Sequence, residues 1–217
     1  MSNARAANKF IARLKPDIII HAAALTGIRE CEENKELAWH TNVVGTENLL
    51  NGVHENVPNT KFVYVSTACV FYGDRGNYDE TDTPHPKNYY SLTKLMGEAA
   101  VRNSGVNWLT IRTNFVPRQK WPYPAAFTDR FGTYLFADDL ALAIKDVIER
   151  KISGVVHVCG DKRMSMFDLA RLTTPEVTPM TMKGYNGPPL TVDMTLISRR
   201  IRPFELTTTL TAQIQPA

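Results

Sequence analysis

The stretch Lys15-Pro16-Asp17-Ile18-Ile19-Ile20-His21-Ala22-Ala23-Ala24 decides the fold class of this chain. Residues 15–17 end a helical pattern over residues 4–14, and residues 17–21 then form a short, nearly unbroken apolar run. Such a run is typical of a parallel strand that is covered on both faces. The three alanines let the backbone approach a flat ligand closely; the alternative is that they only relieve crowding where the strand meets the next helix.

Outward from this stretch, strand and helix patterns alternate along the chain. Apolar runs predict three further strands, at residues 61–66, 107–111 and 154–159. Periodic apolar residues predict helices over 33–54, over 89–102 and from Asp138 or Asp139 to about residue 150. This alternation favours right-handed βαβ crossovers and an open parallel sheet, which is an α/β fold.

The remaining segments lack a clear period. Residues 67–88 predict a polar loop, and residues 114–132, with three prolines, predict an irregular loop on the substrate side. Ser165 begins a short helix with a capping-box-like pattern. Residues 161–217 predict a small C-terminal lobe that wraps the surface and is interleaved with the loop 114–132.

The composition of the chain excludes several classes of function. The 217 residues carry 25 basic and 22 acidic side chains, scattered along the chain, and a net charge of +3 argues against nucleic-acid binding. The three cysteines lack metal-ligand spacing and indicate a reduced, cytoplasmic compartment. The sequence contains no cluster of carboxylates that would predict a metal site. No apolar run is long enough to span a bilayer. The N-terminus has no apolar signal core, which argues against secretion.

The chemistry-bearing pattern is Tyr90-Ser91-Leu92-Thr93-Lys94. Positions i and i+4 share one face of a helix, so Tyr90 and Lys94 can point into one cleft. A phenol has a pKa near 10, and a nearby ammonium lowers it toward the range useful for proton transfer. Taken alone this spacing is weak, because a chain with 8 tyrosines often contains such a pair on its surface.

The position of Thr67 strengthens the interpretation of Tyr90 and Lys94 as parts of a proton-transfer site. It follows the strand 61–66, at the carboxyl edge of the sheet, where open α/β folds bind ligands. Capping of the strand end by Ser66 and Thr67 is the alternative for these hydroxyls. The order of strand, hydroxyls, polar loop and Tyr-x-x-x-Lys helix is much harder to obtain by accident.

With these motifs the chain resembles the extended short-chain dehydrogenase/reductase superfamily. It most resembles the branch of dTDP-4-dehydrorhamnose reductase and related nucleotide-sugar epimerases, dehydratases and reductases. The resemblance implies a Rossmann-like NAD(P)-binding domain at residues 1–160 and a substrate-side lobe at residues 161–217. The segments that carry it are Lys15–Ala24, Thr41–Thr46, Val65–Phe71, Tyr90–Lys94 with Gly97-Glu98, Thr133–Ala141 and Gly154–Val158.

The resemblance implies catalytic roles for three residues. Tyr90 would be the general acid/base and Thr67 would hydrogen-bond the substrate oxygen. Lys94 would contact the nicotinamide ribose and lower the Tyr90 pKa. The expected reaction is hydride exchange between the nicotinamide and a carbon of a nucleotide sugar, in a reductase, epimerase or dehydratase.

Further residues would bind the cofactor, which is NAD or NADP. Ala22, Ala23, Ala24 and Val65 would line it, in the positions that the family uses. Asn42 would either contact the cofactor or satisfy local backbone. His21 stands where the family usually has a small or polar residue and is assigned no catalysis.

The chain departs from the family pattern at its start. The family begins with a strand, a Gly-x-x-Gly-x-x-Gly turn and a helix, and this turn occurs nowhere in the sequence. Three explanations compete: an N-terminally truncated piece of a longer enzyme, a natural short form, or a sheet completed by a partner chain. The alternative function is therefore a non-catalytic sugar-nucleotide-binding or regulatory protein, or an inactive fragment.

A parallel sheet without those strands would leave an unpaired edge, which favours pairing with another chain. We therefore predict that the chain associates, as a homodimer. A clean monomer in size-exclusion chromatography with light scattering would contradict this prediction.

Overall fold

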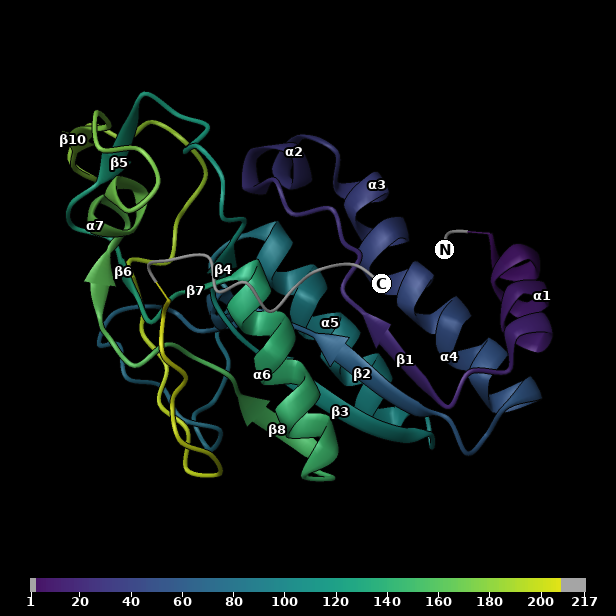
Figure 1. Ribbon diagram of the computed structural model, residues 1–217. Coiled ribbons are helices and arrows are strands. Elements are labelled where there is room, and N and C mark those ends of the chain that lie inside the picture. The colour runs from purple at the N-terminus through teal and green to yellow at the C-terminus, as the bar shows by residue number, and fades with distance from the viewer. Residues whose placement is uncertain (1–2, 208–217) are drawn as a thin grey trace.

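The computed structural model describes residues 3–207, and a four-stranded parallel sheet lies at its centre (Figure 1). The strand order is β1-β2-β3-β8, with each strand hydrogen-bonded to its neighbour in parallel. The strands are β1 (Ile18–His21), β2 (Lys61–Val65), β3 (Asn107–Arg112) and β8 (Gly154–His157). The predicted α/β fold with an open parallel sheet is confirmed.

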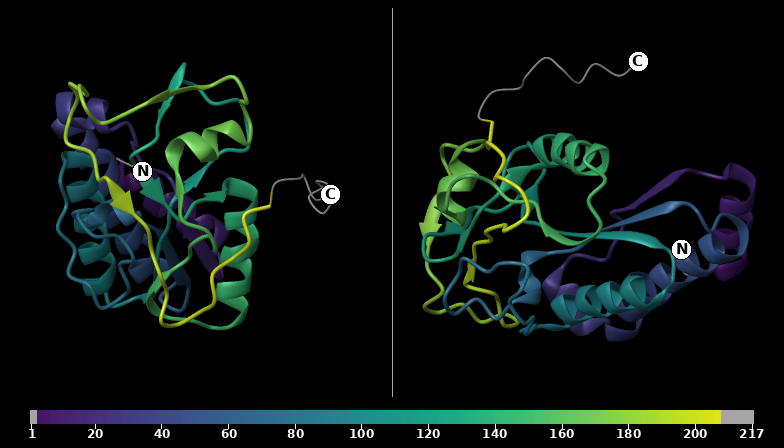
Figure 2. Two further views of the ribbon diagram at one scale, coloured as in Figure 1. Left: turned by 90° about the vertical axis from the view of Figure 1, so that its left-hand side faces the viewer. Right: turned by 90° about the horizontal axis from the view of Figure 1, so that it is seen from below.

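Helices cover the two faces of this sheet, as the views in Figures 1 and 2 show. One face carries α1 (Ala4–Leu14), α4 (Gly45–Asn56) and α5 (Tyr89–Asn103). The other face carries α6 (Ala137–Glu149). The buried residues of α6 recur at helical spacing, because a surface helix buries one apolar stripe: Leu140, Ala143, Ile144 and Val147.

Strand β1 is an edge strand that is covered on one face only. His21 is buried on the face of α1 and α4, whereas Ile18 and Ile20 are 42% and 51% exposed on the opposite face. The buried cluster under α6 takes residues from β2, β3 and β8 but none from β1. The expectation that this apolar run is covered on both faces is therefore wrong.

The helix predicted over 33–54 is divided in the structure. A separate helix, α2 (Ile28–Glu33), precedes it. Asn34 interrupts the helix because its backbone dihedrals are not helical. The helix then continues as α3 (Lys35–Trp39), a π-helical turn (His40–Val44) and α4. π-helical turns are frequent at functional sites, and Asn42 is buried in this one.

The predicted polar loop 67–88 contributes to the core. It contains the short 3-10 helix Ala68–Val70, and the Phe71 ring stacks on the Tyr78 ring at 4.4 Å between centroids. The C-terminal residues Met194 and Leu196 are buried in the same apolar cluster. The C-terminal segment therefore completes a core rather than only wrapping the surface.

A small lobe lies beyond the carboxyl ends of the sheet strands (Figure 1). The loop 114–132, expected to be irregular, supplies three of its short strands. Ser165 caps α7 as predicted, with its Oγ accepting from the Asp168 N–H at 3.0 Å. Residues 208–217 of the expected lobe lie outside the described residues. The elements are β4 (Phe115–Val116), β5 (Ala125–Phe127), β6 (Phe131–Gly132), β7 (Leu135–Phe136), β9 (Met164–Ser165), α7 (Met166–Arg171), β10 (Thr178–Met180) and β11 (Asp193–Met194).

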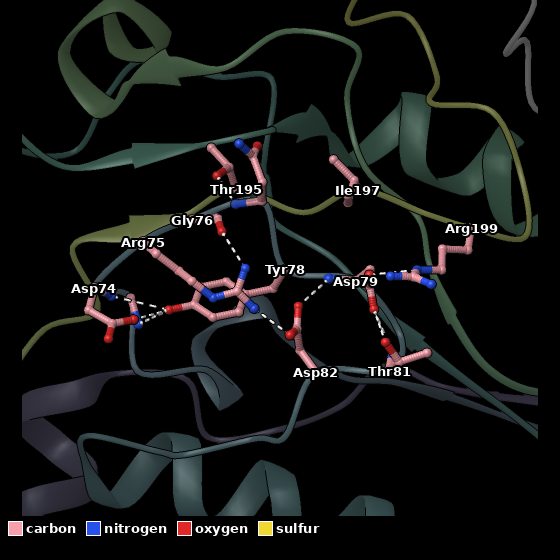
Figure 3. A network of polar contacts seen from close by, with 12 residues as sticks. Asp74, Arg75, Gly76, Tyr78, Asp79, Thr81, Asp82, Thr195, Ile197 and Arg199 are labelled. Atoms are coloured by element: carbon pink, nitrogen blue, oxygen red, sulfur yellow. Dashed lines mark hydrogen bonds and ion pairs between the residues drawn. The ribbon is translucent and has the colours of Figure 1, made fainter.

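A polar network ties the loop after β2 to the C-terminal segment (Figure 3). The Tyr78 N–H donates to the Thr195 carbonyl at 3.0 Å, and the Ile197 N–H donates to the Tyr78 carbonyl at 2.9 Å. Arg199 Nε donates to the Asp79 carboxylate at 2.6 Å. These bonds hold residues 193–199 against the loop that follows β2.

Close packing between α5 and β2 generates a stability prediction. A Cβ on Gly97 would lie 2.2 Å from the Tyr64 hydroxyl and 2.7 Å from its Cζ, and Tyr64 is fully buried. We expect Gly97→Ala to lower the free energy of unfolding by about 1–3 kcal/mol, because the ring cannot move away. Urea denaturation measures this change.

Gly52→Ala is the matched control on a neighbouring helix. The nearest atom to the new Cβ there would be Ile11 Cδ1, at 2.9 Å, and the end of that side chain can rotate; the nearest backbone atom, Asn8 Cα, lies at an ordinary contact distance of 3.4 Å. Helix propensity favours alanine by up to about 1 kcal/mol. Equal losses in the two variants would contradict the close-packing argument.

The Asp79 contacts predict an acid dependence of stability. Hydrogen bonds from Thr81, followed by Arg199, lower the Asp79 pKa to about 2. A folded-state pKa below the unfolded value near 4 contributes stability that is present above pH ~4 and is lost as the pH falls toward ~2. The free energy of unfolding of the wild type should therefore exceed that of Asp79→Asn at neutral pH. The difference between the two proteins should shrink as the pH falls from ~4 toward ~2.

Denaturation of both proteins at a series of pH values measures that difference. Asp17→Asn is the control, because Asp17 is exposed on the turn before β1. A difference between wild type and Asp79→Asn that stays constant down to pH ~2 would contradict the prediction.

Candidate active site

The site is built where β2 ends and α5 begins. Thr67 follows β2, and its Oγ1 accepts from the Cys69 N–H at 3.1 Å, so it caps the short 3-10 helix. This contact is the capping that the sequence left as an alternative. The Thr67 side chain also lies close enough to the Tyr90 phenol to lower its pKa, so the structure brings capping and the predicted juxtaposition together.

Tyr90 is held in the first turn of α5. Asn88 caps this helix, with its Oδ1 accepting from the Ser91 N–H at 2.9 Å. Asn88 Nδ2 in turn donates to the Pro189 carbonyl at 2.8 Å, which links the start of α5 to the C-terminal lobe. The phenol therefore occupies a defined place at the carboxyl edge of the sheet.

The Tyr90 pKa is shifted in the direction opposite to the expected one. Burial raises this pKa above its ordinary value, the neighbouring Cys69 thiol raises it further, and the nearby Thr67 hydroxyl offsets only part of the rise. The expectation that Lys94 lowers this pKa is therefore wrong for the chain without ligands. The physical reason is desolvation, which disfavours the phenolate.

Lys94 lies one helical turn further along α5 and is 3% exposed. Its Nζ donates to the Val65 carbonyl at 2.8 Å and lies 4.1 Å from the centroid of the Tyr64 ring. Burial lowers the Lys94 pKa to about 7, whereas the nearby Glu98 carboxylate raises it. An ammonium has three donors, and the bond to Val65 uses one of them.

A buried ion pair supports this site, and the sequence analysis did not anticipate it. Glu98 is 1% exposed and accepts from Arg112 through both Nε, at 3.0 Å, and a terminal guanidinium nitrogen, at 2.7 Å. The Ser66 Oγ donates to the same carboxylate at 2.5 Å. A signal was present: Lys94 and Glu98 fall on the stripe of α5 that also contains Gly97 and Val101.

The alanines expected to line the cofactor follow β1 at the same edge. Ala22 and Ala23 are exposed and Ala24 is partly buried, so a flat ligand can reach this backbone. Val65 is itself buried, and its carbonyl binds Lys94. Among the predicted cofactor residues, the alanines are thus the accessible ones.

Asn42 and His21 take part in local hydrogen bonding. The Asn42 side chain accepts from the Leu25 N–H at 2.7 Å and donates to the Leu25 carbonyl and to Thr93 Oγ1. This favours the local-backbone alternative for Asn42. His21 Nε2 pairs with Thr46 Oγ1 at 3.0 Å, and burial, with the Lys94 charge, lowers its pKa to about 4.

A cavity of about 750 Å³ opens between the start of α2 and the C-terminal lobe. Trp121 and Tyr123, which contact each other edge to face at 6.0 Å, line one side of it. Arg29 and Arg130 add positive charge, and Arg130 is largely buried with Nε bound to the Thr191 carbonyl. The two arginines were not singled out from the sequence, because their separation of about a hundred residues hides their proximity to one cavity.

Residues 3–207 contain no group of three or more His, Cys, Asp or Glu side chains that could hold a metal ion. Within the same range no helix combines the length and the apolar character needed to cross a bilayer.

Comparison with known proteins agrees with the geometry. The family model of the RmlD substrate binding domain matches residues 1–121. The dTDP-4-dehydrorhamnose reductase of Salmonella typhimurium is 28% identical over 195 residues, which cover 81% of this chain and 64% of the relative. The methionine adenosyltransferase 2 subunit beta of Xenopus laevis is 32% identical over 189 residues, 76% of this chain and 56% of the relative. The chain thus spans less than two thirds of the length of these two relatives.

Solved structures share the fold. The dTDP-4-dehydrorhamnose reductase of Clostridium acetobutylicum is 28% identical with a TM-score of 0.81, over 90% of this chain and 77% of that one. The Bacillus anthracis enzyme of the same name, solved in complex with NADP, is 24% identical with a TM-score of 0.81 and equal coverage. The Rossmann-like fold inferred from the motifs is confirmed.

Proposed function

The chain belongs to the family of the RmlD substrate binding domain, and on that premise we propose that it acts in NAD(P)-dependent chemistry on a nucleotide sugar. Reduction of a sugar carbonyl is the reaction that we favour, with epimerisation and dehydration as related outcomes. The observation that carries the proposal is the juxtaposition of Thr67 and Tyr90 at the carboxyl edge of the sheet, with Lys94 one turn away.

The residues fit the nicotinamide end of a dinucleotide. Ala22 and Ala23 offer accessible backbone beside the hydroxyls, and Lys94 keeps donors for a ribose. When bound, the reduced cofactor would supply the hydride. The Gly-x-x-Gly-x-x-Gly turn that holds the pyrophosphate in this superfamily does not occur in the 217 residues, so the residues named here would contact the nicotinamide end of the cofactor and not its pyrophosphate.

In the favoured reaction the chain supplies the proton. Thr67 Oγ and Tyr90 Oη donate hydrogen bonds to the substrate carbonyl oxygen, which polarises the carbon for attack. As the carbon gains a hydride, the Tyr90 proton passes to the oxygen and gives the alcohol. The phenolate that remains is stabilised by the Lys94 ammonium, because an opposite charge close by favours the ionised form.

The cavity supports the substrate class. Aromatic side chains such as Trp121 suit a base or a sugar ring, and Arg29 with Arg130 suits a diphosphate. We propose that residues 1–160 carry the dinucleotide site and that the lobe from residue 161, together with residues 114–132, carries the substrate side. Association of two copies through the exposed edge at β1 remains part of the proposal.

A second candidate is a non-catalytic subunit. The observation that favours it is the similarity to a protein named methionine adenosyltransferase 2 subunit beta, a subunit by its name. In that case the fold would bind a nucleotide or sugar nucleotide without turnover. Dinucleotide binding does not separate the two candidates, whereas turnover does.

The first experiment measures dinucleotide binding. We expect the fluorescence of NADH or NADPH to change on titration with the chain, and the preferred cofactor to have the lower Kd. No binding of either up to millimolar concentration would overturn the enzyme proposal for this chain.

The second experiment measures turnover of dTDP-4-dehydrorhamnose, the substrate in the relatives' name, by wild type and Tyr90→Phe. Loss of a general acid should lower kcat by about 100-fold or more and leave the dinucleotide Kd unchanged. Tyr89→Phe is the matched control, since Tyr89 is the adjacent residue on α5 and its ring contacts Lys35 instead. Equal turnover in wild type and Tyr90→Phe would remove Tyr90 from the mechanism.

A further inference from the structure

Three segments of the site meet at the carboxylate of Glu98. Ser66, which precedes Thr67, donates to it at 2.5 Å. Arg112, at the end of β3, pairs with it through two guanidinium nitrogens. Glu98 itself lies one turn after Lys94 on α5. No other ion pair among residues 3–207 has both side chains as deeply buried, at 3% and 1% exposure.

We propose that Glu98 is a positioning residue of the proposed reaction: it holds Ser66, and with it Thr67, at the end of β2 and favours the charged form of Lys94 in the apolar interior. The proposal rests on the proposed function for its kinetic consequence only. The electrostatic part concerns the chain without any ligand.

The charges around Lys94 support this role. Of the groups that face it, His21 from β1 is neutral, because burial lowers its pKa to about 4, and the Tyr64 and Tyr90 phenols are neutral because burial raises their pKa values. Arg112 from β3 is a cation. Glu98 is therefore the anion that offsets the desolvation of Lys94.

Replacement by an uncharged isostere separates this role from packing. In Glu98→Gln the side chain keeps its shape and one carbonyl oxygen for Ser66 or Arg112, but the negative charge is gone. The desolvation of Lys94 is then no longer offset by the Glu98 charge. A residue that only filled space or tied the backbone would leave the ionisation of Lys94 unchanged.

The test is an NMR titration of isotopically labelled lysine side chains, with the Lys94 resonance assigned by its absence from Lys94→Met. We expect the Lys94 pKa to fall in Glu98→Gln by about one unit or more, a tenfold change in the acid dissociation constant. Asp139→Asn is the matched control. Asp139 lies on α6, and its buried carboxylate pairs with Arg118, so this change should leave the Lys94 pKa unchanged. A Lys94 pKa equal to wild type in Glu98→Gln would overturn the proposal.

The kinetic readout separates this proposal from the proposed function. If the chain turns over substrate, the alkaline limb of the kcat profile should move to lower pH in Glu98→Gln, because Lys94 loses its proton earlier. An equal loss of kcat at every pH would overturn the proposal. If no turnover is found, the reductase proposal fails and the titration still decides the role of Glu98.

Glu98→Asp covers the case in which Glu98→Gln does not fold. It keeps the charge but withdraws it by one methylene from Ser66 and Lys94, so the Lys94 pKa should fall by a smaller amount. A wild-type Lys94 pKa in Glu98→Asp, with Glu98→Gln unfolded, would overturn the proposal.

Discussion

The buried ion pair between Glu98 and Arg112 is the constraint on which the rest of the site depends. Removing two charges from water costs several kcal/mol each, and the interior repays this only when the geometry is good and the remaining lone pairs are satisfied. Here the guanidinium binds through two nitrogens and Ser66 supplies a further donor. The pair therefore fixes α5 against the ends of β2 and β3, where Thr67, Tyr90 and Lys94 lie.

Burial gives these groups their protonation states. Desolvation raises the Tyr90 pKa and lowers that of Lys94 to about 7, so the unliganded chain favours a neutral phenol and holds its amine near the point of losing a proton. A neutral phenol is the form that can donate a proton to a carbonyl. The developing phenolate then needs the ammonium, which is why the charges close to Lys94 matter for the proposed reaction.

The same edge of the sheet carries the apolar core that supports the lobe. Phe71 and Tyr78 stack in the loop after β2, and Leu196 from the C-terminal segment packs in the same cluster. The lobe in turn binds the helix that bears Tyr90, through the contact between Asn88 and the Pro189 carbonyl. The C-terminal lobe and the region of Thr67 and Tyr90 are thus parts of one packed structure.

Local patterns in the chain established the parallel sheet, the family and the candidate site, because apolar runs, helical spacing and the Thr67 and Tyr90 motifs depend on near neighbours in sequence. They did not reveal the direction of the Tyr90 pKa shift, the pairing of Glu98 with Arg112, or the core role of Leu196. Each of these arises from residues distant in sequence that the fold brings into contact. Desolvation and ion pairing depend on that three-dimensional surrounding, so they come into being only when the chain has packed.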